Sequence, residues 1–212
     1  CVDAATVMDK WLGQSEKNVA NLFHDARRAS GSGRPAIIFI DEVDSLVGIR
    51  GDEVGGEVRT RNQFLKEMDS ISDKANPSHV YVVGATNKPW ALDEAFIRRF
   101  QKRIFVPLPN VEARTELISI YSKDLTVSGD VSTDELVDLT DGYSASDIRD
   151  ILQSAQIKVV RELFQSQKIT ERSRPRAIRM EDIREILRKR RPSVSPEMLR
   201  FYDKWYERYK AL

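Results

Sequence analysis

The feature that most constrains the fold is a run of five apolar residues, 36–40, followed directly by two carboxylates, Asp41 and Glu42. An unbroken apolar run of this length predicts a strand that is buried on both faces, as in a parallel sheet. In open α/β sheets, ligands bind at the carboxyl ends of the strands. We therefore expect the two acids to lie where chemistry takes place.

Adjacent residues of a strand point to opposite faces of the sheet, so Asp41 and Glu42 are expected to have different roles. We assign Asp41 to a magnesium ion and Glu42 to an attacking water. This is the arrangement of a Walker B motif of the DE type, and it implies ATP hydrolysis.

The glycine-rich loop that cradles phosphates, G-x-x-x-x-G-K-[ST], is missing from the sequence. The glycine pair with the right spacing is Gly51 and Gly56, but Glu57 follows it. The sequence also opens at Cys1 like the end of a strand without its beginning. We expect the phosphate-binding half of the site to lie upstream, and the 212 residues alone to bind ATP poorly.

Composition narrows the class of protein. Apolar residues make up 41% of the chain, which permits a real core. The net charge of +1, from 34 basic and 33 acidic residues, gives no argument for a nucleic-acid binder. The single cysteine, Cys1, cannot form an internal disulfide, which suits a reducing cytoplasm. No apolar run approaches the length that a membrane span needs.

The first half of the chain alternates strands with helices. The expected core strands are 35–40, 80–85 and 103–106. A helix that precedes the first of these strands buries the apolar face formed by Val19, Leu22, Phe23 and Ala26. A second helix is expected at 57–70, with Val58, Phe64, Leu65 and Met68 facing inward. This alternation predicts an α/β fold with a parallel sheet.

After residue 111 the pattern predicts helices and no strand. Capping boxes are expected where Ser132 precedes Glu135 and where Ser144 precedes Asp147. Further helices are expected at 180–189 and 196–209, and residues 168–177 form an exposed loop. We therefore predict a large domain at 1–109, a helical lid at 110–194 and a C-terminal helix at 195–212, with the hinge near 107–111.

Asn87 follows the second strand. Taken alone, an amide here is most simply a turn residue. At the end of a strand that follows the DE strand, it becomes a candidate sensor that holds a water or a γ-phosphate oxygen by hydrogen bonds.

Five motifs occur in order along the chain: KWLG (10–13), IFIDEVDS (38–45), GATNKPW (84–90), RRF (98–100) and GYSASDI (142–148). Together they resemble AAA ATPases of the meiotic clade, which includes katanin, spastin and the ATPases that disassemble ESCRT filaments. The resemblance implies a large AAA+ ATPase domain without its N-terminal part, a helical lid, and ATP and Mg²⁺ as cofactors.

The resemblance also implies roles for site residues. Arg98 and Arg99 match arginines that reach the γ-phosphate of a neighbouring subunit, which implies a ring. Gly142, Ser144 and Ala145 match a lid turn near adenine and ribose, although the family usually has glycine at 145. Without the resemblance, the basic run 98–103 is a solvated face or a weak anion site, and residues 142–145 are a helix cap.

Lys10, Trp11 and Leu12 match the first pore loop of such rings, where an aromatic side chain grips an extended polypeptide. Local packing of Trp11 at a helix start is the simpler alternative. Residues 48–56 match the second pore loop, and a mobile surface loop is an equally good interpretation.

The C-terminal segment 191–209 resembles the extra helix of this clade. Its stripe of Met198, Phe201, Trp205 and Tyr209 is expected to pack on the large domain. Residues 165–179 are too short for the β insertion of the eukaryotic ESCRT ATPases, so the sequence looks most similar to archaeal ESCRT-associated (Cdv) cell-division ATPases. The basic stretch 184–191 carries interleaved acids and is interpreted as a solvated helix face.

The expected function is that of a cytoplasmic hexameric motor that remodels ESCRT-III-like filaments in membrane scission and cell division. It would reach the membrane only indirectly and bind no nucleic acid. A severing ATPase like katanin or spastin, a DNA-directed AAA+ machine and a non-catalytic scaffold are the alternatives.

Overall fold

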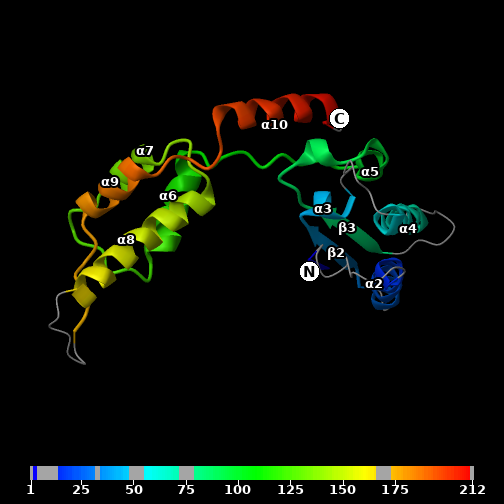
Figure 1. Ribbon diagram of the computed structural model, residues 1–212, viewed down its shortest axis with the longest axis horizontal. Coiled ribbons are helices and arrows are strands. Elements are labelled where there is room, and N and C mark those ends of the chain that lie inside the picture. Colours follow the sequence, from blue (N-terminus) through cyan, green and yellow to red (C-terminus); the bar gives the residue numbers. More distant parts are fainter. Residues whose placement is uncertain are drawn as a thin grey trace. The chain divides into compact units, whose positions relative to one another are not determined.

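The computed structural model of the chain describes residues 2–3, 14–31, 34–47, 55–71, 79–165 and 173–210 (Figure 1). The chain forms two compact units. The first contains Cys1–Ile104 together with Lys204–Leu212, and the second contains Phe105–Asp203. Each unit is described by itself.

The first unit is built on a sheet of three parallel strands in the order β1-β2-β3. The strands are β1 (Val2–Asp3), β2 (Ala36–Asp41) and β3 (Val80–Gly84). Ile40 pairs with Val2 on one side and with Gly84 on the other, so the carboxyl ends of the strands share one edge. The predicted parallel α/β sheet is confirmed.

One face of this sheet is covered by helices. The helical segments are α2 (Gln14–Ser30), α3 (Val43–Val47), α4 (Gly55–Ile71), the 3₁₀ turn η1 (Pro89–Ala91) and α5 (Glu94–Arg99). Helix α2 packs on β2, β3 and α4. Phe64 contacts Phe23 edge-on at 5.2 Å between ring centroids and stacks on Phe96 at 5.6 Å. The predicted inward faces of both long helices are confirmed, because Val19, Phe23, Phe64 and Met68 are buried.

The other face of the sheet is uncovered within the described residues. Ile37, Tyr81 and Val83 are 67%, 58% and 46% exposed, whereas Ile38 and Ile40 on the opposite face are buried. The prediction that residues 36–40 are buried on both faces is therefore wrong for this chain. The physical reason is that α2 and α4 belong to the same core cluster, on the side of Ile38 and Ile40.

The predicted strand at 103–106 is also wrong, because this segment has no regular structure. Ile104 is 86% exposed and Val106 is 81% exposed. An extended segment becomes a strand only when a neighbour accepts its backbone hydrogen bonds. Within the part of the chain that the structure describes, β1, β2 and β3 pair only with each other. Arg103 instead donates from Nη2 to the Ile97 carbonyl at 2.7 Å and from Nη1 to the Tyr209 carbonyl.

The second unit is helical, as predicted. Its helices are α6 (Val111–Ser122), α7 (Thr133–Leu139), α8 (Ala145–Gln165), α9 (Met180–Lys189) and the first part of α10 (Pro196–Tyr209). Helix α6 packs on α7 and α8, and α9 packs on α8. The core is made of apolar side chains from these helices, including Ile118, Leu136, Ile148, Ile151 and Ile183. None of the helices in the described ranges is long and apolar enough to cross a lipid bilayer.

The predicted helix starts are present. Ser144 and Asp147 form a reciprocal capping box, with each backbone amide donating to the other side chain at 3.0 and 3.2 Å. Ser132 accepts from the Glu135 amide at 3.3 Å. The carboxylate of Glu135 pairs instead with Arg184, so only half of that box forms.

The inward stripe of α10 differs from the prediction by one residue. Phe201 is 64% exposed, whereas Tyr202 is half-buried and its ring lies 6.1 Å from Phe105. At about 100° per residue, Tyr202 lies nearer than Phe201 to the mean direction of Met198, Trp205 and Tyr209. Position 201 therefore falls at the rim of the apolar face, and the prediction that placed it inward is wrong.

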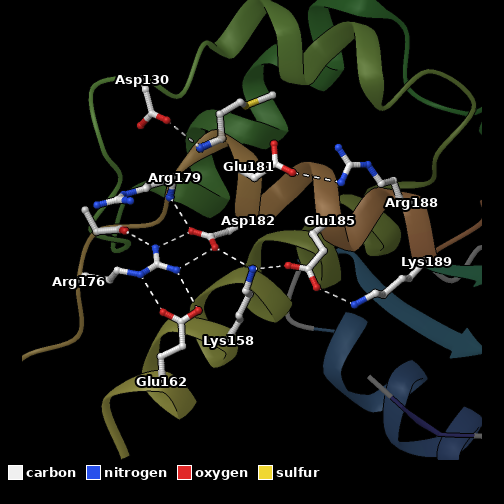
Figure 2. Close-up of polar contacts among 12 residues, drawn as sticks. Asp130, Lys158, Glu162, Arg176, Arg179, Glu181, Asp182, Glu185, Arg188 and Lys189 are labelled. Atoms are coloured by element: carbon white, nitrogen blue, oxygen red, sulfur yellow. Dashed lines mark hydrogen bonds and ion pairs between the residues drawn. The ribbon is translucent and has the colours of Figure 1, made fainter. Parts of the chain in front are cut away.

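A cluster of ion pairs ties α8, α9 and the segment between them together (Figure 2). Arg176 contacts Glu162 at 2.8 Å and the buried Asp182 at 2.6 Å, and Lys158 contacts Asp182 at 2.9 Å and Glu185 at 2.5 Å. We call these five residues the lid ion-pair cluster.

The basic stretch 184–191 behaves as the predicted solvated helix face. Arg184, Arg188, Lys189 and Arg190 each pair with a carboxylate, from Glu135, Glu181, Glu185 and Asp150 respectively. Neighbouring acids therefore offset most of this positive charge.

Candidate active site

The turn from β2 into α3 carries the two acids. Glu42 has a φ of 48°, in the left-handed region that non-glycine residues rarely adopt. Its amide donates to Asp41 Oδ1 at 2.9 Å, and its carbonyl accepts from the amide and the Oγ of Ser45, both at 2.8 Å. The backbone of Glu42 is thus held at both ends, while Asp41 and Glu42 are exposed. Backbone strain of this kind clusters at functional sites.

The end of β3 lies beside this turn. The Ala85 amide donates to the Ile40 carbonyl at 2.9 Å, and the Val43 amide donates to the Ala85 carbonyl at 3.0 Å. Asn87 follows two residues later and is exposed. The structure therefore brings the strand ends that carry Asp41, Glu42 and Asn87 together, as expected for a shared edge of a parallel sheet.

A side-chain contact that the sequence reasoning missed connects the two strand ends. Thr86 Oγ1 donates to Asp44 Oδ1 at 2.5 Å and accepts from the Lys88 amide at 2.9 Å. Asp44 lies on α3, directly after the acidic turn, and Thr86 precedes Asn87. Both residues lie within motifs noted in the sequence, but their pairing across 42 positions had no local signal.

The two arginines at the end of α5 have different environments. The Arg98 side chain is 79% exposed and contacts Glu94 of its own helix at 3.4 Å. Arg99 binds Asp69 of α4 with two hydrogen bonds of 2.8 Å and donates to the Ala95 carbonyl at 2.8 Å. The hydrogen bonds that Arg99 donates to Asp69 raise the pKa of Arg99 above its ordinary value. Arg99 is therefore fixed within its own subunit, and Arg98 points its charge into solvent.

The turn before α8 belongs to the second unit. Gly142 has a φ of +77°, which requires a residue without a Cβ or a strained one. Ser144 caps α8, and Ala145 is the first residue of that helix. Ser144 and Ser193 both donate to the buried Asp147, each at 2.8 Å. These hydrogen bonds help to hold the pKa of Asp147 below its ordinary value, against the opposing effect of burial.

The remaining predicted site residues are not described. Lys10, Trp11 and Leu12 lie outside the described residues, as do residues 48–54 of the second pore-loop candidate. Gly55 and Gly56 already belong to α4. The turn at 142–145 and the turn of Asp41 and Glu42 lie in different units.

Among the described residues, no group of three or more His, Cys, Asp and Glu side chains is arranged to hold a metal ion. At a nucleotide site, Mg²⁺ takes one or two carboxylates and completes its shell with phosphates and waters. Asp41 is exposed at the carboxyl end of β2, a position that suits a carboxylate ligand of Mg²⁺.

Comparison with known proteins identifies the two parts of the chain. Residues 1–108 match the model of the ATPase family associated with various cellular activities (AAA), and residues 130–185 match the AAA+ lid domain. The crystal structure of the FIGL-1 AAA domain superposes with a TM-score of 0.84 at 32% identity, over 99% of this chain and 67% of that one. The same domain in complex with ADP gives a TM-score of 0.83.

Curated relatives support the same family assignment. Cell division protein C of Sulfolobus acidocaldarius is 54% identical over all 212 residues, which cover 55% of that protein. Spastin of Sus scrofa is 41% identical over 96% of this chain and 33% of its own length. The chain thus spans about half or less of these relatives, and it belongs to the AAA ATPase family, with an ATPase domain followed by an AAA+ lid.

Proposed function

We propose that the complete protein hydrolyses ATP at a site to which this chain contributes three parts. They are the acidic turn of Asp41 and Glu42, the sensor Asn87, and the arginine finger Arg98. The observation that carries the proposal is the left-handed turn at Glu42, which presents two exposed acids beside the strand end that leads to Asn87. Bound Mg²⁺ would neutralise charge on the β- and γ-phosphates. Asp41 would hold it, Glu42 would accept a proton from the attacking water, and Asn87 would orient that water or the γ-phosphate.

The phosphate-binding loop is proposed to come from polypeptide outside these 212 residues. The chain covers 55% of Cell division protein C, which leaves room for such a segment. The uncovered sheet face with Ile37, Tyr81 and Val83 supports this, because parallel sheets are normally covered on both faces. The exposed Ile104 and Val106 fit a strand position whose neighbour is supplied by the same segment.

Arg98 is proposed as the arginine that completes the site of a neighbouring subunit. Its side chain is 79% exposed at the end of α5, whereas Arg99 is held by Asp69. An arginine supplied in trans makes hydrolysis depend on assembly. A head-to-tail arrangement of this kind can close into a ring, which we take to be a hexamer.

The turn of Gly142, Ser144 and Ala145 is proposed to contact the base or ribose of the nucleotide. The positive φ at Gly142 and the small residue at 145 allow close approach of a ligand to the backbone. This role agrees with the likeness to a lid domain, and with the ADP that the solved FIGL-1 AAA domain binds.

The substrate is proposed to be an ESCRT-III-like filament protein, pulled through the central pore by Lys10, Trp11 and Leu12 during membrane scission in cell division. The 54% identity to Cell division protein C supports cell division over severing, since the identity to spastin is 41%. The motor would act in the cytoplasm and reach the membrane through its filament. The balanced charge of the basic stretch gives no support to a DNA-directed machine.

A reconstitution with three substrates tests this proposal. The full-length protein and ATP are added to filaments of an ESCRT-III-like protein, to microtubules and to double-stranded DNA. Filament disassembly that needs ATP, with microtubules and DNA unaffected, is the expected result. Severing of microtubules would favour the spastin-like alternative, and ATPase stimulation by DNA would favour the nucleic-acid machine.

A further inference from the structure

The lid contains a buried arginine, Arg114. It is 5% exposed and sits on α6. Its Nε donates to the Val137 carbonyl at 3.1 Å, and its Nη1 donates to the Pro109 carbonyl at 3.0 Å. Nη1 also forms an ion pair with Asp141 Oδ1 at 3.1 Å. A buried guanidinium is costly unless it is well paired, so this geometry is strongly determined.

The partners of Arg114 belong to different parts of the lid. Pro109 precedes Asn110, the N-cap of α6, and lies in the segment that leads from the first unit into the lid. Val137 is in the last turns of α7. Asp141 opens the turn that continues into Gly142. One side chain therefore connects the entry to the lid with the start of this turn.

The two halves of the turn are held by different contacts. The second half is tied down by the Ser144–Asp147 capping box and by the Tyr143 hydroxyl, which donates to the Arg190 carbonyl at 2.8 Å. The first half has backbone hydrogen bonds from the Asp141 amide to the Asp138 carbonyl at 3.3 Å and from the Tyr143 amide to the Thr140 carbonyl at 3.2 Å, and Asp141 adds the ion pair to Arg114. Gly142 lies between them with its positive φ, and the ion pair joins the first half of the turn to Val137 and Pro109 through Arg114.

We propose that Arg114 is a positioning residue for nucleotide binding. It fixes Asp141, and through it the turn at 142–145, to the segment that enters the lid at Pro109. Nucleotide contact at the turn is thereby coupled to the position of that segment. This inference rests on the proposed nucleotide role of the turn.

The two ends of the ion pair allow a test that separates positioning from folding. The Asp141 side chain is 81% exposed, so Asp141→Asn removes the charge without opening a cavity. Arg114 then keeps its two carbonyl acceptors, Val137 and Pro109. The fold should survive, while the first half of the turn loses its ion pair with Arg114.

The experiment uses the full-length protein. In Asp141→Asn, the KM for ATP and the Kd for a fluorescent ADP analogue are expected to rise about fivefold, as for the loss of one ion pair. The kcat and the thermal midpoint should remain near wild type. Asp141→Glu should restore part of the affinity. Glu162→Gln, which breaks a lid ion pair with Arg176 instead, should leave KM unchanged.

Each outcome is decisive. A wild-type KM and Kd in Asp141→Asn would overturn the inference, and so would an equal rise in Glu162→Gln, because the effect would then be general loosening of the lid. If Glu42→Gln abolishes hydrolysis while Asp141→Asn behaves as wild type, only this inference fails. If Glu42→Gln hydrolyses ATP normally, the proposed function fails instead.

Discussion

The Arg99 guanidinium and the Asp69 carboxylate form a two-pronged ion pair, with Nε–Oδ1 and Nη2–Oδ2 both at 2.8 Å. This pair fastens α5 to α4 inside one subunit. The neighbouring Arg98 contacts Glu94 at 3.4 Å, and its side chain is 79% exposed. Two adjacent arginines that look alike in sequence therefore differ in what they can reach.

The first prediction separates these arginines. Arg98→Ala should lower kcat by about 10³ or more, as for arginine fingers in general, with an unchanged thermal midpoint. Arg99→Ala should instead lower the free energy of unfolding by about 1 kcal/mol, because Asp69 loses its partner. Turnover assays and thermal melts on the full-length variants measure both effects.

Mixed rings provide the control for trans action. Subunits with Arg98→Ala and subunits with Glu42→Gln are each expected to be inactive alone. Mixing them should restore some turnover, since some interfaces then combine an intact finger with an intact pocket. An active Arg98→Ala together with an inactive Arg99→Ala would show that the two roles are reversed.

The second prediction concerns the contact between Thr86 and Asp44. Thr86→Val keeps the shape of the side chain but removes the hydroxyl that joins α3 to the segment of Asn87. We expect kcat to fall about tenfold, because a misplaced sensor weakens transition-state contacts, while ADP affinity is preserved. Thr115→Val, on the exposed surface of α6, is the matched control. Equal turnover in the two variants would exclude a positioning role for Thr86.

The third prediction concerns acid stability of the lid. The hydrogen bonds of Arg176 hold the pKa of Asp182 well below its ordinary value, and those of Lys158 lower the pKa of Glu185 to about 2. Because the unfolded chain protonates these groups at about pH 4, their contribution is complete above that pH and is lost as the pH falls towards about 2. Denaturation followed from pH 7 down to pH 2 measures this loss.

Asp182→Asn tests the assignment of that effect. It should destabilise the lid at pH 7 by about 2 kcal/mol, since Arg176 and Lys158 lose a buried partner. The difference from wild type should shrink as the pH falls below about 4. Asp25→Asn, at an exposed pair, should have little effect at any pH. A difference that stays constant with pH would show that the cluster does not cause the acid response.

Local signals predicted much of the fold. Helices α9 and α10 begin and end where the sequence indicated, because their caps and apolar stripes are encoded within each segment. The strand ends with Asp41 and Asn87 are adjacent, because consecutive parallel strands share an edge. In contrast, the strand expected at 103–106 did not form, and one face of β2 is exposed. Each of these features needs a neighbouring segment that the described residues do not supply.

The candidate site could be predicted from the sequence only where a residue of suitable chemistry also lies within a recognisable motif. The acids and the sensor follow from residue type at strand ends. The pairing of Arg99 with Asp69, 30 positions away, and of Arg114 with Val137, 23 positions away, has no local signature. Such contacts depend on tertiary packing of α4 against α5 and of α6 against α7. Sequence reasoning therefore grouped Arg98 with Arg99 and did not single out Arg114.

The fourth prediction concerns substrate translocation. Trp11→Ala should hydrolyse ATP at near the wild-type rate but fail to disassemble ESCRT-III-like filaments, because a large aromatic at the pore grips extended polypeptide. Phe164→Ala, which removes an exposed aromatic from α8, is the control. Equal disassembly by the Trp11 variant and wild type would remove the pore assignment.

ATP turnover by Glu42→Gln in the full-length protein tests the central claim most directly. The substitution keeps the size of the side chain at the left-handed turn but removes the base beside the proposed magnesium ligand. ATP binding should be preserved, and hydrolysis should fall by at least about 10², the usual contribution of a general base. Turnover near the wild-type rate, with binding intact, would contradict the assignment of the acidic turn as the site of hydrolysis.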